Sequence, residues 1–276
     1  MRIAAIVVAY NSARDLPESL GCLGALPVER SVVVDNSSAD DSATVAKRYT
    51  PDVLSAPNDG FGAAINLAAR AVPEADAYLL LNPDCRLDPE AFATLVAALE
   101  NDPGLGVVAP LMRYPNGGYG VSSGSDPSMA KEWLAALRVD HLVPAGLRRA
   151  LARSAFLRSR IRMLAYLDVE PSAETRAVEW VSGFCMLVRA SAFREIGGFD
   201  PGYFLYFEDV DLCKRLRAAG WGVASVGASV ADHKESTSTA AVGKNRLYRD
   251  GMAVYFDRHG TSRQRTLATA LRKFPL

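Results

Sequence analysis

Apolar runs alternate with helical patterns along residues 1–110. The runs RIAAIVVAY, SVVVD, DVLSAP, AYLLLN and LGVVAP are short and mostly aliphatic or β-branched. Helices are expected from Asp15 onward, over Asp40 to Tyr49, over Phe61 to Ala71 and over Pro89 to Glu100. A chain in which strands alternate with helices forms a parallel sheet with helices on both faces. The pattern therefore predicts an α/β fold with a Rossmann-like, mostly parallel central sheet.

Asn or Asp stands at the carboxyl end of each of the first four strands. The four segments are Tyr10-Asn11-Ser12, Asp35-Asn36-Ser37, Asn58-Asp59-Gly60 and Asn82-Pro83-Asp84. Any single segment is explained equally well by a helix cap or a turn. Together they point to one edge of the sheet, which is where open α/β sheets bind their ligands. We therefore expect a binding site at this edge.

The second half of the chain is less regular. An apolar strand is expected over Phe184 to Val188, a short helix from Ala190, and another strand in GWGVASVG. Within residues 147–165, aliphatic side chains fall near one helical face and six arginines, with no acid, surround it. Such a helix either lies on an anionic membrane surface or packs on the domain with a solvated basic face.

Composition excludes several classes of protein. The 31 basic and 31 acidic residues give zero net charge, so no global field recruits nucleic acid. No apolar run reaches the roughly 20 residues that a membrane span requires. The four cysteines are dispersed and form no Cys-x-x-Cys pair, which favours a reducing compartment. We expect a cytoplasmic protein, soluble or peripheral on the inner face of the cell membrane, without a nucleic-acid partner.

The usual nucleotide and hydrolase motifs are missing. GFGAAIN lacks a third glycine and follows the third strand, and no GxxxxGK[ST] or GxSxG occurs. The remaining candidates are Asp84 after a strand, His233 after a late strand, and Glu208, Asp209 and Asp211 inside the apolar stretch FLYFEDVDLCKRL. One carboxylate, one imidazole and diphosphate oxygens can complete a site for Mg²⁺ or Mn²⁺. A carboxylate near apolar groups can have a raised pKa suited to a general base.

Seven motifs carry a resemblance to a known family. They are VVAYN, VVDNSS, NDGFGAAIN, LLLNPD, WVSGFCMLVR, GGFDPGYFLYFEDVDLCKRL and ADHKES, in that order. The chain resembles family 2 glycosyltransferases of the GT-A fold, and most of all bacterial rhamnosyltransferases that use dTDP-L-rhamnose. The resemblance covers residues 1–120 and 176–260. It implies one domain over 1–260 and a basic helical tail over 241–276, the first part of which overlaps the end of the domain. The parts of the domain are a nucleotide-sugar-binding half (1–115), a variable insertion (116–175) and an acceptor and catalytic half (176–240).

The resemblance also implies residue roles. Asp209 would be the catalytic base, and Asp84 and His233 would bind Mg²⁺ or Mn²⁺. The donor would be bound by Ala9, Tyr10, Asn11, Asp35, Asn36, Asn58, Gly60, Phe61, Asn66 and Asn82, the last of which stands where many relatives have the first Asp of a DxD motif. The acceptor and donor sugar would be bordered by Trp180, Ser182, Gly183 and Glu208. Asp211 is expected to favour the helix N-terminus.

The implied reaction is transfer of L-rhamnose, with inversion, from dTDP-L-rhamnose. The acceptor would be a hydroxyl of a cell-envelope glycan or of a saccharide linked to polyprenyl diphosphate. Three other readings are a family 2 transferase of another UDP- or GDP-sugar, a sugar nucleotidyltransferase, and a non-catalytic module that binds nucleotide-sugar. The nucleotidyltransferase is disfavoured because VVAYNSARD has no Gly-rich loop. The acceptor, the linkage and the oligomeric state, a homodimer included, are left open.

Overall fold

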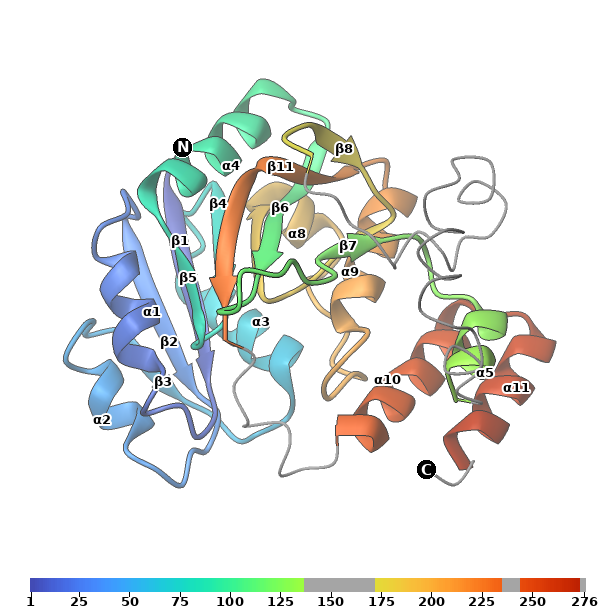
Figure 1. Cartoon of the computed structure of the whole chain (residues 1–276). Coiled ribbons are helices and arrows are strands. Elements are labelled where there is room, and N and C mark those ends of the chain that lie inside the picture. Colours follow the sequence, from blue (N-terminus) through green and yellow to red (C-terminus); the bar gives the residue numbers. More distant parts are fainter. Residues whose placement is uncertain (137–171, 235–243, 274–276) are drawn as a thin grey trace.

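The structure is a computed structural model that describes residues 1–136, 172–234 and 244–273 (Figure 1). The arginine-rich stretch over residues 147–165 lies outside the described residues. The described part consists of a large sheet with helices on both faces, together with a group of helices at one side that holds the C-terminal end (Figure 1).

Nine strands of the described residues form one sheet, in the order β3-β2-β1-β4-β10-β6-β11-β5, with β8 paired to β11. Their bounds are β1 Ile3–Ala9, β2 Arg30–Asp35, β3 Val53–Ser55, β4 Ala77–Leu81, β5 Cys85–Leu87, β6 Leu105–Arg113, β8 Thr175–Ala177, β10 Cys185–Arg189 and β11 Gly222–His233. A separate antiparallel pair joins β7 (Ser123–Gly124) to β9 (Trp180–Val181).

The sheet is mostly parallel. β1 pairs in parallel with β2 and β4, β2 with β3, and β6 with β11. β10 runs antiparallel between β4 and β6, and β5 runs antiparallel to β11. The predicted mostly parallel α/β sheet is confirmed, while the reversed direction of β10 was not predicted.

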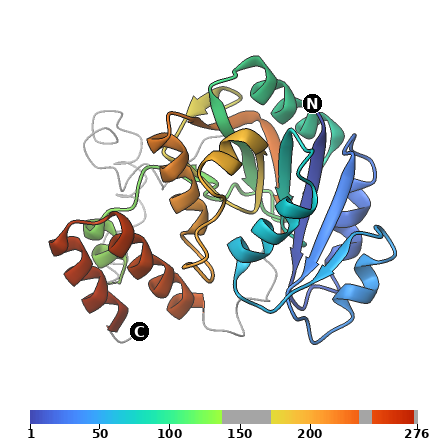
Figure 2. The same cartoon turned by 180° about the vertical axis from the view of Figure 1, so that it is seen from behind.

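Alternate side chains of β1 enter two different cores. Ile3, Ala5 and Val7 belong to the core beneath α1 (Leu16–Leu23) and α4 (Pro89–Asn101). Ala4 and Ile6 belong to the core beneath α3, α8 and α9, whose bounds are Phe61–Ala71, Ala190–Glu195 and Glu208–Ala218. Both sets are apolar because a strand that is buried on two faces needs an apolar side chain at every position. Figure 2 shows the same helices from behind.

A local signal explains where the helix α4 begins. Asp88 precedes α4, and its carboxylate accepts a hydrogen bond from the Ala91 N–H at 2.8 Å, while Pro89 occupies the first turn. Such a cap contributes about 1 kcal/mol to helix stability. The helix α3 covers Phe61–Ala71, the range that the sequence predicted. The helix α2 is shorter than predicted and covers Ser42–Ala46.

A third core lies at the C-terminal end of the chain. The helices α10 (Lys244–His259) and α11 (Ser262–Lys273) pack with α5 (Met129–Ala136) against Tyr203, Phe207 and Val210. The predicted helical C-terminal part is therefore confirmed, and it contacts the loop that precedes α9. Within the described residues, no helix is both long and apolar enough to cross a membrane.

Candidate active site

The ends of the first three strands are tied to one another. The Asn36 N–H donates to the Ala9 carbonyl at 2.8 Å, and the Ala56 N–H donates to the Asp35 carbonyl at 3.0 Å. The Asn36 side chain donates to Asn58 Oδ1 at 3.1 Å and to the Gly60 carbonyl at 3.4 Å. These four sequence-predicted positions, together with Ala9, therefore lie together at one edge of the sheet.

Two acceptor atoms at this edge are buried without a partner. They are Asp35 Oδ1 and Asn36 Oδ1, which have no hydrogen-bond donor among the described residues. Asp35 is 7% exposed and Asn36 is 3% exposed. An unsatisfied buried acceptor costs about 1–3 kcal/mol, so such an atom in a folded protein calls for a donor, which a ligand or a water molecule can supply. The pair is therefore a candidate for contact with a ligand that carries N–H or O–H groups.

The neighbouring candidates are placed differently. Ala9 is fully buried, so its side chain belongs to the core. Tyr10 is 36% exposed at the same strand end. Asn11 adopts a φ of 51°, its N–H donates to Ser38 Oγ at 3.0 Å, and its side chain accepts from the Ala39 N–H at 2.8 Å. The Asn11 side chain therefore fixes the adjoining loop.

The loop at Gly60 touches the loop that leads into α9. The Phe61 N–H donates to the Phe204 carbonyl at 3.0 Å. Gly60 has a φ of +106°, and a Cβ added there would lie 2.5 Å from the Phe204 carbonyl oxygen. Asn66 makes a second link, because its side chain donates to the Phe199 carbonyl at 2.8 Å and accepts from the Phe199 N–H at 2.9 Å. The loop at Gly60 and the loop before α9 are therefore linked at two points.

All three carboxylates of the FEDVD stretch stand in the first turn of α9. Asp209 is held by two backbone N–H groups: Oδ2 accepts from Gly183 at 2.9 Å, and Oδ1 accepts from Val210 at 2.8 Å. Glu208 precedes it and is 6% exposed, with Oε2 buried and unpaired among the described residues. The preceding residues, Tyr206 and Phe207, have φ values of 68° and 69°.

Both carboxyl groups have raised pKa values. Burial raises the pKa of Glu208 to about 8, with a further contribution from the charge of Asp209. Burial also raises the pKa of Asp209, and the hydrogen bonds from the Gly183 and Val210 N–H groups lower it in part. Asp209 is thus the carboxylate with partners that stabilise its charged form, whereas Glu208 is held against ionisation.

The residues that are expected to border the acceptor lie in one short segment next to Asp209. Gly183 follows the β9 strand, and its N–H meets Asp209. The Ser182 N–H donates to the Ser122 carbonyl at 2.8 Å, and the Trp180 indole N–H donates to the Ser125 carbonyl at 2.9 Å. Trp180 also packs against the cores on both sides of α9. The structure therefore brings Trp180, Ser182 and Gly183 together beside the start of α9.

Asp84 and His233 lie side by side. His233 Nε2 is 3.2 Å from Asp84 Oδ1, and the two side chains are 11% and 7% exposed. The pairing of β5 with β11 brings them together, because His233 lies opposite Cys85 in the register. Asn82 begins the same turn, and its N–H donates to the Phe184 carbonyl at 2.8 Å.

This pair fits part of a metal site. Adjacent ligands of an octahedral Mg²⁺ or Mn²⁺ lie about 3 Å apart, given metal–ligand distances of about 2.1 Å. The separation of 3.2 Å between Asp84 Oδ1 and His233 Nε2 matches that spacing. No cluster of three or more His, Cys, Asp or Glu side chains suited to a metal occurs in the described residues. The protein would therefore supply two ligands, and the substrate and water would supply the others.

The sequence interpretation missed one residue that contacts the first turn of α9. His259, the last residue of α10, lies 2.7 Å from Asp211, the third carboxylate of the FEDVD stretch. Asp211 lies in the first turn of α9 as expected, but its side chain is buried and paired with other side chains. A contact between residues 48 positions apart, in two helices with separate patterns, leaves no local signal in the sequence.

Solved structures share this fold. A mannosyltransferase from Pyrobaculum calidifontis, in complex with GDP-Man and Mn²⁺, superimposes with a TM-score of 0.59 at 14% identity, over 98% of this chain and 73% of that one. GalNAc-T7, with UDP, GalNAc and Mn²⁺, gives a TM-score of 0.59 at 13% identity, over 98% of this chain and 54% of that one. At these identities the likeness shows the fold alone, which is that of the GT-A class.

Sequence comparison gives the family. Residues 2–253 match the family described as Glycosyltransferase like family 2. The chain belongs to glycosyltransferase family 2, as its motifs predicted. It is 32% identical to the N-acetylglucosaminyl-diphospho-decaprenol L-rhamnosyltransferase of Mycobacterium tuberculosis over 273 residues, which cover 92% of this chain and 84% of that protein. A 43-residue segment, 16% of each chain, is 58% identical to the rhamnosyltransferase WbbL of Escherichia coli K12.

Proposed function

We propose that this glycosyltransferase transfers L-rhamnose from dTDP-L-rhamnose to a hydroxyl of a lipid-linked saccharide, with inversion at the anomeric carbon. The observation that carries the reaction is the Asp209 carboxylate, which two backbone N–H groups hold at the start of α9. The choice of sugar and acceptor is supported by the mycobacterial relative, whose name specifies an L-rhamnosyltransferase and a diphospho-decaprenol.

The donor nucleotide binds at the strand ends. Asp35 Oδ1 is a buried acceptor without a donor among the described residues, and the imide N–H of a thymine or uracil supplies one. Asn36 and Asn58 line the ribose and phosphate side, next to the backbone of Gly60 and Phe61. A glycine at position 60 lets this backbone approach both the phosphates and Phe204.

The Asp209 carboxylate is the general base. It takes the proton from the acceptor hydroxyl, and the oxygen forms a bond to the anomeric carbon on the face opposite the nucleotide. The bond between that carbon and the diphosphate oxygen breaks, and its electron pair leaves with dTDP. The proton ends on Asp209 and is later lost to solvent. A single carboxylate is enough because no covalent sugar–enzyme bond forms.

Glu208 has a different part. Because burial keeps its pKa near 8, it is protonated at neutral pH and adds no negative charge beside the base. Its unpaired Oε2 offers a hydrogen-bonding atom to a sugar hydroxyl. Trp180, Ser182 and Gly183 border the same space and place the acceptor against Asp209.

Asp84 and His233 would hold Mg²⁺ or Mn²⁺. Such an ion, when bound, offsets the negative charge of the diphosphate leaving group. Many relatives have an acidic residue at the position of Asn82. With Asn82 there, the protein would supply two side-chain ligands, the carboxylate of Asp84 and the imidazole of His233. The proposal places the enzyme in the cytoplasm, at the inner membrane face, where a polyprenyl-linked acceptor is presented. Membrane contact through residues 147–165 lies outside the described part of the chain.

A panel of donors tests the proposal. Purified enzyme is incubated with a polyprenyl-diphospho-GlcNAc acceptor and dTDP-L-rhamnose, UDP-GlcNAc, UDP-glucose or GDP-mannose, each with Mg²⁺, with Mn²⁺ or with EDTA. We expect product only with dTDP-L-rhamnose, and the anomeric configuration in the product should be opposite to that in the donor. Product from a UDP- or GDP-sugar but not from dTDP-L-rhamnose contradicts the donor assignment. Retained configuration contradicts the single-displacement mechanism.

A further inference from the structure

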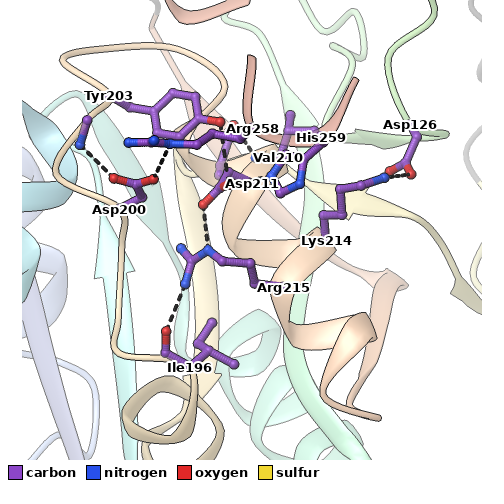
Figure 3. Close-up of polar contacts among 12 residues, drawn as sticks. Asp126, Ile196, Asp200, Tyr203, Val210, Asp211, Lys214, Arg215, Arg258 and His259 are labelled. Carbon is purple, nitrogen blue, oxygen red and sulfur yellow. Dashed lines mark hydrogen bonds and ion pairs between the residues drawn. The ribbon is translucent and has the colours of Figure 1, made fainter. Parts of the chain in front are cut away.

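The carboxylate of Asp211 joins α9 to the C-terminal helices. It is 1% exposed, and three side chains converge on it (Figure 3). Arg215 Nε lies 2.7 Å from Oδ2, His259 Nε2 lies 2.7 Å from Oδ1, and the Tyr203 hydroxyl donates to Oδ1 at 3.4 Å. The partners come from α9 itself, from the end of α10 and from the loop before α9.

Asp211 and Asp209 are held from different sides of the same helical turn. Residues two apart in an α-helix point about 200° away from each other. Asp209 meets Gly183 on one side, and Asp211 meets His259 and Arg215 on the other. Displacement of either anchor therefore rotates or tilts the turn that carries the base.

This turn needs support from outside because its own start is strained. Tyr206 and Phe207 both adopt left-handed backbone conformations, which cost about 1–3 kcal/mol each for residues with a side chain. Phe207 occupies the N-cap position and makes no side-chain capping bond. Neighbouring parts of the fold must hold such a conformation in place, since the local chain does not favour it.

The helix α10 supplies that support at two further points. A Cβ added at Gly251 would lie 2.2 Å from the Tyr206 carbonyl oxygen, so the backbone of α10 is pressed against the strained loop. Arg258 Nε binds Asp200 Oδ2 at 3.1 Å, at the beginning of the same loop (Figure 3). Arg215 adds hydrogen bonds to the Ile196 and Gly198 carbonyls at 3.0 and 2.7 Å. The loop is therefore fixed at its beginning and at its end.

We propose that His259 is a positioning residue for the reaction, holding the first turn of α9 through Asp211 so that the Asp209 carboxylate faces the acceptor. The inference rests on the proposed role of Asp209 as base. In this proposal the C-terminal helices help to position the Asp209 carboxylate, although they are distant in the sequence from the stretch that contains it.

The test compares His259→Ala with His259→Gln, whose amide can donate to Asp211 as Nε2 does. We expect His259→Ala to lower kcat at least about tenfold, since a displacement of about 1 Å in a catalytic group can cost about 10²-fold. The KM for the donor should stay within twofold, and His259→Gln should recover kcat to within threefold of wild type. Donor binding measured by calorimetry confirms that each variant is folded.

Arg272→Gln is the matched control. Arg272 binds Asp250 and so joins α11 to α10, and among the described residues this is the hydrogen bond and ion pair that it makes. The control should keep kcat within twofold even if its melting temperature falls. A kcat within twofold of wild type in His259→Ala overturns the proposal, and so do equal losses of kcat in the Ala and Gln variants or in the control. If His259→Ala does not bind donor, Asp211→Asn replaces it in the same comparison.

The outcome separates this inference from the proposed function. Every variant is measured as a ratio to wild-type turnover with the same donor. If Asp209→Asn abolishes turnover while His259→Ala does not change it, only the positioning role fails. If wild type transfers no sugar, the proposed function itself fails.

Discussion

Gly60 lies where the loop before α3 meets the loop before α9. Its φ of 106° and ψ of 167° fall in a region that only glycine adopts readily. An alanine at this position would place its Cβ 2.5 Å from the Phe204 carbonyl oxygen, 2.8 Å from Phe204 Cα and 2.9 Å from the Tyr203 carbonyl oxygen. All three atoms belong to the backbone, so no side-chain rotation relieves the contact.

The expected cost of Gly60→Ala follows from these two effects. The backbone conformation alone costs about 1–3 kcal/mol. Separation of the two loops also weakens the hydrogen bond from the Phe61 N–H to the Phe204 carbonyl. We expect a total loss of about 2–4 kcal/mol in the free energy of unfolding. At about 2–4 °C per kcal/mol for a chain of this size, the melting temperature should fall by about 10 °C.

Gly220→Ala is the control that isolates the contact. Gly220 has a φ of +94°, and a Cβ added there has no heavy atom within 4 Å. Thermal unfolding and kcat/KM are measured for both variants. Gly60→Ala should lose more stability than Gly220→Ala, and only Gly60→Ala should lose kcat/KM, because its displaced loops carry the proposed donor site and the proposed base. Equal losses of stability, or unchanged kcat/KM in Gly60→Ala, would refute the reasoning.

Two further predictions concern the titrating and metal-binding groups. The pKa of Glu208 rises from 4.5 to about 8 on folding, so between these values the folded state keeps a proton that the unfolded state has lost. Stability should therefore fall as pH rises from about 4.5 to about 8, and Glu208→Gln should reduce this slope in melting scans; an unchanged slope contradicts the assignment. His233→Ala should weaken Mn²⁺ binding in the presence of dTDP by at least about tenfold in calorimetry, and Asp84→Asn should do the same. Wild-type Mn²⁺ affinity in both variants would show that the ion binds elsewhere.

Much of the fold could be predicted because its signals are local. The range Phe61–Ala71 of α3 follows from an apolar periodicity that begins directly after Gly60. Asp35 and Asn36 could be assigned to the carboxyl-end edge of the sheet because their place at the end of a buried strand is visible in the sequence. In the same way, the mostly parallel sheet follows from the alternation of strands and helices.

Other features depend on tertiary contacts that leave no local trace. The apolar run of β10 predicts a strand but not its antiparallel direction, which its neighbours β4 and β6 determine. The place of Asn66 near the nucleotide stays a prediction, whereas the hydrogen bonds of its amide to the backbone of Phe199, 133 residues away, had no signal in the sequence. The link from His259 to Asp211 arises in the same way. Sequence patterns selected the residues of the proposed catalytic motif, whereas the structure identifies what holds them.

Asp209→Asn gives the most direct test of the central claim, that this carboxylate is the base of an inverting sugar transfer. The amide keeps the size of the side chain and cannot take a proton at neutral pH. With dTDP-L-rhamnose and a polyprenyl-diphospho-GlcNAc acceptor, we predict a loss of kcat of at least about 10²-fold. Calorimetry should show donor affinity within threefold of wild type. A variant that turns over at the wild-type rate contradicts the account.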